Sequence, residues 1–434
     1  MKAVGITAEY NPMHTGHIWQ MGEARRLSGA DCTVVVMSGD FVQRGAPAVY
    51  DKYTRAKAAL TGGADLVLEL PVVYAVSSAE MFALGAIRTM AALNVSCVSF
   101  GSESTDLSLM RRIASFLACE PAVYREYIAK AMRQGASFPA AREEALVQVF
   151  CHNSGEAVPS SLIPEDAVRR LLRSPNDILG IEYMKAAERE HCPCEFVPVR
   201  RIGARHDAAA LTLPEVTREG TPGELSASAI REQILRASRD GKIPDPAVLS
   251  CIAPGLSESV RRKEILPLSP EDFRQVLYAK IEDILYRSGY SKVCAAQELT
   301  QYEDIPESVA MRIVRLFDPA YSMDEFIDTV KTRNVTRANV ARGLLHILLE
   351  IRKQTAEKYR GGLPHVRVLG FTKTGQRYLH ECAREAPCPV ITKTAGFGDL
   401  LAEDRHAANL YRQIYAAAGG RLLPDEFRAG IIRL

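Results

Sequence analysis

The chain has 434 residues, of which 47% are apolar and 24% charged, a composition that is typical of a globular protein and excludes a largely disordered one. Its formal net charge of +2 neither requires nor excludes a nucleic acid as partner. No stretch reaches the ~18 uninterrupted apolar residues of a membrane span, and no signal-peptide pattern precedes the first predicted strand. We therefore expect a cytoplasmic protein of two or three domains without membrane association.

The first hundred residues alternate between short apolar runs and amphipathic stretches. The runs predict strands at 3–8, 32–37, 66–70 and 95–100, and the stretches between them predict helices at 17–28, 52–61 and 78–93. This alternation indicates an α/β fold with a Rossmann-like parallel sheet and helices on both faces. Right-handed crossovers would place the loops after the strands along one edge, where they converge on a crevice: 9–15, 38–45, 71–76 and 101–105.

The turn after the first strand contains Asn11 and Pro12 and leads into His14-Thr15-Gly16-His17. Two histidines three positions apart in a first helical turn lie on the same side of the helix. The free backbone N–H groups and the dipole of such a helix start favour an anion, and Gly16 leaves room for a phosphate. The motif therefore predicts a nucleotide phosphate site, although two surface histidines on an ordinary helix would have the same pattern.

The loop after the second strand reads Ser-Gly-Asp-Phe-Val-Gln-Arg-Gly over residues 38–45. Its place at the carboxyl edge of the sheet makes Asp40, Gln43 and Arg44 candidates for contacts with phosphate or substrate. Lys52 and Arg55 in the next helix could also face phosphates. The alternatives are a solvated loop and a solvated helix face.

Further candidates follow at two later strand ends. Gly101 ends the fourth strand, where a glycine lets adenine or ribose lie against the backbone. Asn176 opens a helix predicted at 176–190 and is its candidate cap. Arg200 and Arg201 end a strand predicted at 194–200, and we expect one of them to reach the nucleotide.

The start of a helix predicted at 226–237 combines small hydroxyl side chains with a cation one turn later. Ser226, Ser228 and Arg231 therefore indicate a second phosphate clamp, with Glu224 as an alternative cap. No metal site is predicted, because the one tight cluster of ligands, 191–194, lacks the second pair that zinc needs. The ten cysteines form no C-x-x-C pair, which is typical of reduced thiols.

The remaining pattern is mainly helical and then mixed. It predicts helices at 107–119, 122–133, 140–149, 167–172, 270–288, 291–301, 309–316, 323–329 and 337–359, followed by strands at 366–371 and 389–393 and helices at 374–384 and 404–418. We divide the chain into a nucleotide-binding domain at 1–240, a mainly helical region at 241–360 and a small α/β C-terminal domain at 361–434. Basic residues concentrate in the helical region, which suits binding of a polyanion such as a nucleic acid. The candidates for this contact are Lys331, Arg333, Arg337 and Arg342. The alternative is that they form a solvated helix face.

Several of these segments, in order and over the whole chain, resemble the bacterial tRNA(Met) cytidine acetate ligase family within the H-x-G-H nucleotidyltransferase superfamily. The segments are AVGITAEYNPMHTGH, SGDFVQRG, FGSES, SPNDILGIEY and NVTRANVARGLLHILL. The resemblance implies a nucleotidyltransferase-like ATP-binding domain at 1–240 and a tRNA-binding role for 241–360. Met13 departs from the phenylalanine that the family often has there, and the segment SASAIR lacks a threonine of the family's version of that clamp.

The resemblance implies that ATP is held by Thr7, Ala8, Glu9, Tyr10, Asn11, Pro12, Met13, His14, Thr15, Gly16, His17, Ile18, Trp19, Gln20, Gly101, Asn176 and Arg201. It also implies an ATP-dependent ligase that acetylates N4 of the wobble cytidine, position 34, of elongator tRNA(Met). Acetate would first attack the α-phosphate, with His14 and His17 countering the charge on the phosphorus oxygens, and acetyl-adenylate would then react with the cytidine. The sequence is compatible with Mg²⁺ on the pyrophosphate.

Two other interpretations remain open. An adenylyl- or cytidylyltransferase for a small phosphorylated metabolite would share the first domain but would not need the long basic helical region. A non-catalytic nucleotide-sensing or RNA-binding protein would not need both histidines, and this chain keeps both.

Overall fold

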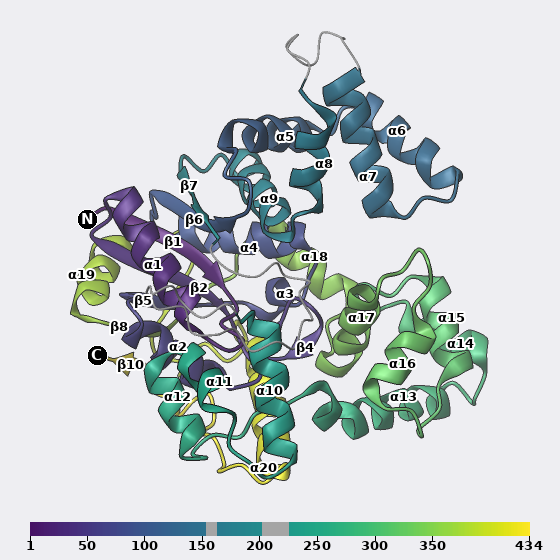
Figure 1. The fold of residues 1–434 in the computed structure, drawn as a ribbon. Coiled ribbons are helices and arrows are strands. Elements are labelled where there is room, and N and C mark those ends of the chain that lie inside the picture. The colour runs from purple at the N-terminus through teal and green to yellow at the C-terminus, as the bar shows by residue number, and fades with distance from the viewer. Residues whose placement is uncertain (153–162, 202–224) are drawn as a thin grey trace.

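An eight-stranded, mostly parallel sheet lies at the centre of the computed structural model, which describes residues 1–152, 163–201 and 225–434 (Figure 1). The strand order is β10-β8-β5-β2-β1-β6-β7, and β9 pairs with β8. The strands are β1 (Ala3–Ala8), β2 (Cys32–Ser38), β5 (Leu66–Leu70), β6 (Cys97–Ser102), β7 (Glu195–Arg200), β8 (Val366–Phe371), β9 (Val390–Ile391) and β10 (Ile432–Arg433). A separate small hairpin consists of β3 (Phe41–Val42) and β4 (Ala46–Pro47). The predicted α/β class with a Rossmann-like sheet is confirmed.

The strands are apolar on both sides because helices cover both faces of the sheet. Along β2 every residue is buried, and its side chains alternate between two cores: Val34 and Val36 belong to one, Val35 and Met37 to the other. The helices that pack around the sheet are α1 (Thr15–Ser28), α2 (Lys52–Thr61), α3 (Val72–Ala75), α4 (Ala79–Ala91), α9 (Pro175–Arg189), α10 (Ala227–Arg239), α11 (Pro246–Cys251), α12 (Pro254–Arg261), α19 (Lys373–Cys382) and α20 (Ala402–Ala417).

Two groups of helices extend from this α/β body (Figure 1). The first contains α5 (Leu107–Cys119), α6 (Ala122–Arg133), α7 (Phe138–Val147), a π-helical turn (Gln148–His152) and α8 (Glu165–Arg173). The second contains a 3₁₀ turn (Pro270–Phe273), α13 (Arg274–Arg287), α14 (Lys292–Leu299), α15 (Glu307–Leu316), α16 (Met323–Val330), α17 (Arg337–Leu349) and α18 (Lys353–Gly361). No helix in the described ranges is both long and apolar enough to cross a bilayer.

The helix predicted at 337–359 is in fact two helices. Glu350 ends α17 in the left-handed conformation, with φ of 55°, and Arg352 is extended before α18 begins. A left-handed residue ends a helix as a glycine would. The prediction was wrong here because Glu350 gives no sequence signal for this conformation.

A small separate α/β domain at 361–434 would have a sheet of its own. The strands of this segment do not form one. Instead β8 pairs antiparallel with β5, and β10 and β9 pair with β8. Residues 361–434 therefore extend the sheet of the first domain.

Candidate active site

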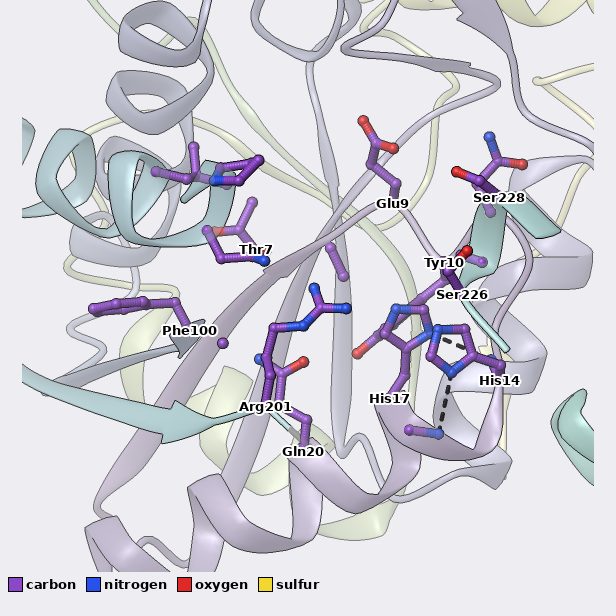
Figure 2. Close-up of a pocket in the computed structure, with 18 of the residues that line it drawn as sticks. Thr7, Glu9, Tyr10, His14, His17, Gln20, Phe100, Arg201, Ser226 and Ser228 are labelled. Atoms are coloured by element: carbon purple, nitrogen blue, oxygen red, sulfur yellow. Dashed lines mark hydrogen bonds between the residues drawn. The ribbon is translucent and has the colours of Figure 1, made fainter. Parts of the chain in front are cut away.

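A cavity of about 340 Å³ lies at the carboxyl end of β1, where the sheet edge meets the first turns of α1, α9 and α10 (Figure 2). Three of the four loops predicted to converge, 9–15, 38–45 and 101–105, contribute residues to it or border it. The fourth does not, because 72–75 forms the buried helix α3, which packs against α18 and α20.

The two histidines of the H-x-G-H motif line this cavity side by side. Their rings stack with centroids 3.7 Å apart, and α1 begins at Thr15 rather than at residue 17, which makes His14 its N-cap. The Nδ1 atom of His14 accepts the Gly16 N–H at 3.1 Å, and the Nδ1 atom of His17 accepts the His14 N–H at 3.3 Å. An imidazole that accepts at Nδ1 carries its proton on Nε2, so both rings present an Nε2–H donor.

Both histidines are neutral in this environment. Burial, followed by the charge of Arg201, lowers the pKa of His14 to about 4. Burial, followed by His14 and Arg201, lowers the pKa of His17 well below its ordinary value. The imidazoles therefore offer hydrogen bonds to phosphate oxygens, and the positive charge that we expected of them comes from the arginines nearby.

Gly101, Asn176 and Arg201 lie together at the end of the cavity bordered by β6 and β7. A Cβ at Gly101 would lie 3.4 Å from Cγ of Arg201, an ordinary van der Waals contact, so the Arg201 side chain lies over this strand end. Asn176 donates from Nδ2 to Glu103 at 2.6 Å. We predicted that Asn176 caps α9, but the cap is Ser174, which accepts the Asp177 N–H. Asn176 therefore lines the cavity without capping the helix.

The opposite end of the cavity is lined by Gln43 and Arg44 from the β3–β4 hairpin and by Ser226, Ser228 and Arg231 from the start of α10. Ser226 is the N-cap of α10; the alternative cap, Glu224, lies outside the described residues. Arg231 donates to the Asn11 carbonyl at 2.6 Å and to Oγ of Ser228 at 3.3 Å. These contacts hold the guanidinium at the edge of the cavity.

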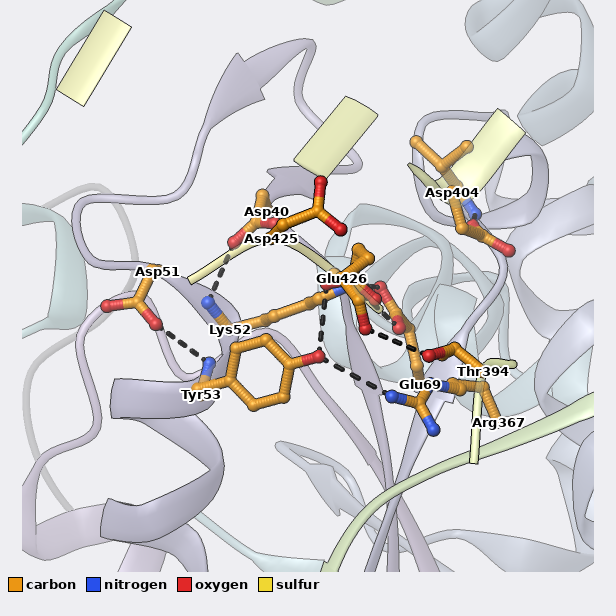
Figure 3. A network of polar contacts seen from close by, with 12 residues as sticks. Asp40, Asp51, Lys52, Tyr53, Glu69, Arg367, Thr394, Asp404, Asp425 and Glu426 are labelled. Atoms are coloured by element: carbon orange, nitrogen blue, oxygen red, sulfur yellow. Dashed lines mark hydrogen bonds and ion pairs between the residues drawn. The ribbon is translucent and has the colours of Figure 1, made fainter. Parts of the chain in front are cut away.

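Three residues of the predicted phosphate loop and helix do not line the cavity. Figure 3 shows two of them, Asp40 and Lys52, within a network of polar contacts. Asp40 is buried and accepts the Lys52 N–H at 2.7 Å. The ammonium of Lys52 lies between Glu69 and Glu426, at 2.8 and 2.9 Å. Arg55 is fully buried and donates to the carbonyls of Glu9, Ser38 and Tyr50. These charges hold the loop in place and do not face a ligand.

Within the range predicted for ATP, most residues line the cavity but Pro12, Met13, Thr15 and Ile18 do not. Met13 is fully buried in the core beneath α1, where its departure from the family pattern is a matter of packing. Lining residues that the sequence analysis did not single out include Phe82, Leu179 and Tyr183. Tyr183 belongs to the motif SPNDILGIEY, whereas Phe82 sits in an ordinary amphipathic pattern that carries no signal.

The four basic residues proposed for tRNA do not line this cavity, and they differ in accessibility. Lys331 and Arg337 are exposed and pair with Asp328. Arg333 is exposed and borders a surface hollow together with Arg169 and Arg173 of the α6–α8 group. Arg342 is buried and pairs with Asp304 at 2.8 Å, so it is not available to a phosphate backbone.

Known proteins resemble this chain over nearly its whole length. The family model described as HIGH Nucleotidyl Transferase matches residues 1–422. A tRNA(Met) cytidine acetate ligase of Caldicellulosiruptor saccharolyticus is 35% identical over 96% of this chain and 94% of its own, and one of Thermoanaerobacter sp. (strain X514) is 32% identical over 96% of both. The crystal structure of Thermotoga maritima TmcAL bound with alpha-thio ATP superposes with a TM-score of 0.82, at 28% identity and with all of both chains covered.

Proposed function

The chain belongs to the HIGH nucleotidyltransferases and, among them, to the tRNA(Met) cytidine acetate ligase family, and from this we propose that it acetylates N4 of the wobble cytidine, position 34, of elongator tRNA(Met) with acetate and ATP. The observation that carries the proposal is the stacked pair of Nε2–H donors at the start of α1, flanked by Arg201 and Arg231 in one cavity. Donors in this arrangement suit an ATP α-phosphate that changes its charge distribution during attack.

In the first step, an oxygen of acetate attacks the α-phosphorus and pyrophosphate leaves, which gives acetyl-adenylate. The work of the protein is alignment and electrostatic stabilisation, because the phosphoryl transition state carries its charge on the phosphorus oxygens. We assign hydrogen bonds to those oxygens to His14 and His17, the adenosine end to Gly101 and Asn176, and the triphosphate to Arg201. Mg²⁺ would arrive on the phosphates, as is usual for nucleotide substrates.

In the second step, the cytidine N4 atom attacks the acetyl carbonyl and AMP leaves. An unpaired anticodon base can be turned out into such a cavity at little cost. We further propose that the exposed Lys331, Arg333 and Arg337 contact the RNA backbone, and we withdraw Arg342 because it is buried in an ion pair.

The test is to incubate the protein with ATP, labelled acetate and bulk tRNA and to analyse the nucleosides by mass. Label in N4-acetylcytidine, together with release of AMP and pyrophosphate, is the expected result. A dinucleotide-like product from a phosphorylated metabolite, with no label in RNA, would instead support an adenylyl- or cytidylyltransferase.

A further inference from the structure

The cavity has two chemically different ends, one on each side of β1. The strand order places β6 and β7 on one side of β1 and β2 on the other, so the loops that carry Gly101 and Arg201 are separated from the hairpin that follows β2. In Figure 2, His14, His17 and Arg201 lie below the end of β1, and the carboxylate of Glu9 points away from them. The nucleotide is assigned to the end that carries Gly101 and Arg201, so the end that carries Glu9 can accept another group.

Glu9 is held firmly at this second end. Its carbonyl accepts a hydrogen bond from the buried Arg55 at 2.7 Å, which fixes the backbone. Its Oε1 atom accepts the Gln43 N–H at 2.9 Å. Among the described residues no other hydrogen bond to this carboxylate is found, so its second oxygen is available to a ligand that donates a hydrogen.

Residues with donor groups line the same end of the cavity as this carboxylate. The Nε2 amide of Gln43 is shielded from solvent and has no partner among the described residues, although it belongs to a residue that lines the cavity. A shielded donor without a partner costs free energy, which a ligand acceptor would recover. The guanidinium groups of Arg44 and Arg231 line the same end. This end of the cavity therefore combines one fixed acceptor with several donor side chains.

This set is complementary to the Watson–Crick edge of cytosine. That edge presents an amino group, N4, next to two acceptors, N3 and O2, and carboxylates are suited to accept from N4. Uracil would direct a carbonyl oxygen at the carboxylate and be repelled. A triphosphate would be repelled for the same reason, because the carboxylate and the phosphates carry like charge.

We propose that the Glu9 end of the cavity is the site of the acyl acceptor, where the cytosine base binds with N4 on Glu9, and that Glu9 is the general base of the transfer step. The proposal rests on the proposed function. The N4 lone pair forms the C–N bond to the acetyl carbon, the C–O bond to AMP breaks, AMP leaves with those electrons, and the N4 proton passes to Glu9. General bases of this kind contribute ~10²–10⁴-fold in rate.

The experiment measures activation and transfer separately in the Glu9→Gln variant. This substitution keeps the shape of the side chain and an oxygen that accepts the Gln43 N–H. Activation is measured as acetate-dependent pyrophosphate exchange into ATP. Transfer is measured in a single turnover with synthetic acetyl-adenylate and an unmodified tRNA(Met) transcript. We expect transfer to fall ~10²-fold or more, at least tenfold further than activation, and Glu9→Asp to recover part of it. Glu195→Gln, an exposed carboxylate at the far end of β7, is the matched control.

Three outcomes would overturn the proposal. Equal losses in exchange and transfer would place Glu9 with ATP, for instance as a ligand of its Mg²⁺. Normal transfer would remove Glu9 from the reaction, and equal inhibition of transfer by competitor transcripts with cytidine or uridine at position 34 would remove the recognition argument. If Glu9→Gln does not fold, Gln43→Ala tests the same end, since it should raise the KM for tRNA more than that for ATP. A wild-type protein without exchange activity would refute the proposed function itself, which is a distinguishable result.

Discussion

At the scale of the residue, His14 has a structural and a chemical role at once. Its Nδ1 atom caps α1 and its Nε2–H is left for the cavity. The same division holds for His17, whose Nδ1 accepts the His14 N–H. The capping contacts therefore select the tautomer that the proposed chemistry needs, which a count of histidines in the sequence does not reveal.

The two roles of His14 can be separated by substitution. His14→Asn supplies an oxygen that caps a helix well but no Nε2–H donor. We expect it to keep the thermal stability within ~0.5 kcal/mol and to lower acetate-dependent exchange by ~10²–10³-fold, as loss of one transition-state donor does. His14→Ala should lose the same activity and also ~1 kcal/mol of stability. Nearly normal exchange in His14→Asn, measured with tRNA binding as a control, would contradict the role of the ring.

The ionisation of His14 gives a second test at this scale. Because burial and Arg201 lower its pKa to about 4, the ring stays neutral when the pH falls from 8 to 5, whereas an unfolded histidine gains a proton near pH 6.5. The folded state thus binds fewer protons in this window and loses stability as the pH falls through it. NMR of ¹⁵N-labelled histidine, assigned with His14→Asn, should show an Nε2–H ring at pH 6. Titration near pH 6.5 would refute the environment described.

At the scale of the element, the β3–β4 hairpin carries Gln43 and Arg44 into the cavity because its turn packs on another helix. Gly45 has φ of 76°, and a Cβ there would overlap the backbone of Ala341 and Arg342 in α17. Such a conformation favours glycine, and the close approach requires it. The buried pair of Arg342 with Asp304 secures the same part of α17.

A glycine with similar φ but open surroundings provides a control for this contact. Gly29 has φ of 62° and nothing within 4 Å of a Cβ. Gly29→Ala should therefore cost only the backbone strain, ~1 kcal/mol. Gly45→Ala should cost ~2–3 kcal/mol or more, since it adds a steric overlap with backbone, and it should raise the KM for tRNA. Equal unfolding free energies in urea for the two variants would mean that the hairpin does not depend on this contact.

At the scale of the whole molecule, the C-terminal segment is part of the α/β body. β8 pairs with β5, Tyr411 donates to the Ala48 carbonyl at 2.9 Å, and Glu426 accepts from Tyr53 at 3.0 Å (Figure 3). Lys52 joins Glu426 to Glu69 of β5; burial opposes its charge, but the two carboxylates raise its pKa well above the ordinary value. Residues as far apart in the chain as Tyr53 and Glu426, which are separated by 373 positions, thus meet in one buried ion cluster beside the loop that borders the cavity.

Removing the central cation of this cluster tests how much the cluster contributes to the stability of the fold. Lys52→Met leaves the buried carboxylates of Glu69 and Glu426 without their shared cation, and we expect a loss of ~3–5 kcal/mol in the free energy of unfolding. Lys57→Met, on the exposed side of the same helix, should change it by less than ~0.5 kcal/mol. Urea unfolding followed by circular dichroism gives both values. A small effect of Lys52→Met would show that the cluster is not needed to hold the C-terminal segment.

Much of this protein could be predicted from its sequence, because the informative patterns are local. Apolar runs bounded by turns predicted β1, β5 and β8 to the residue, and the period of α2, α5 and α6 did the same for those helices. The spacing of His14, Gly16 and His17 depends only on the geometry of one helical turn. Right-handed crossovers place the loops that follow parallel strands along one edge of the sheet, so three loops of the cavity could be brought together in advance.

What only the tertiary structure decided involves contacts between distant segments. In the sequence, these four residues are ordinary polar residues: Asp40, Lys52, Arg55 and Arg342. Only packing shows that their side chains form buried ion pairs and hydrogen bonds within the protein. The sheet pairing of β8 with β5 and the neutral state of the two imidazoles have the same origin. Periodicity and helix starts are short-range properties that a sequence displays, whereas strand partners, burial and ionisation depend on which surfaces the folded chain brings together.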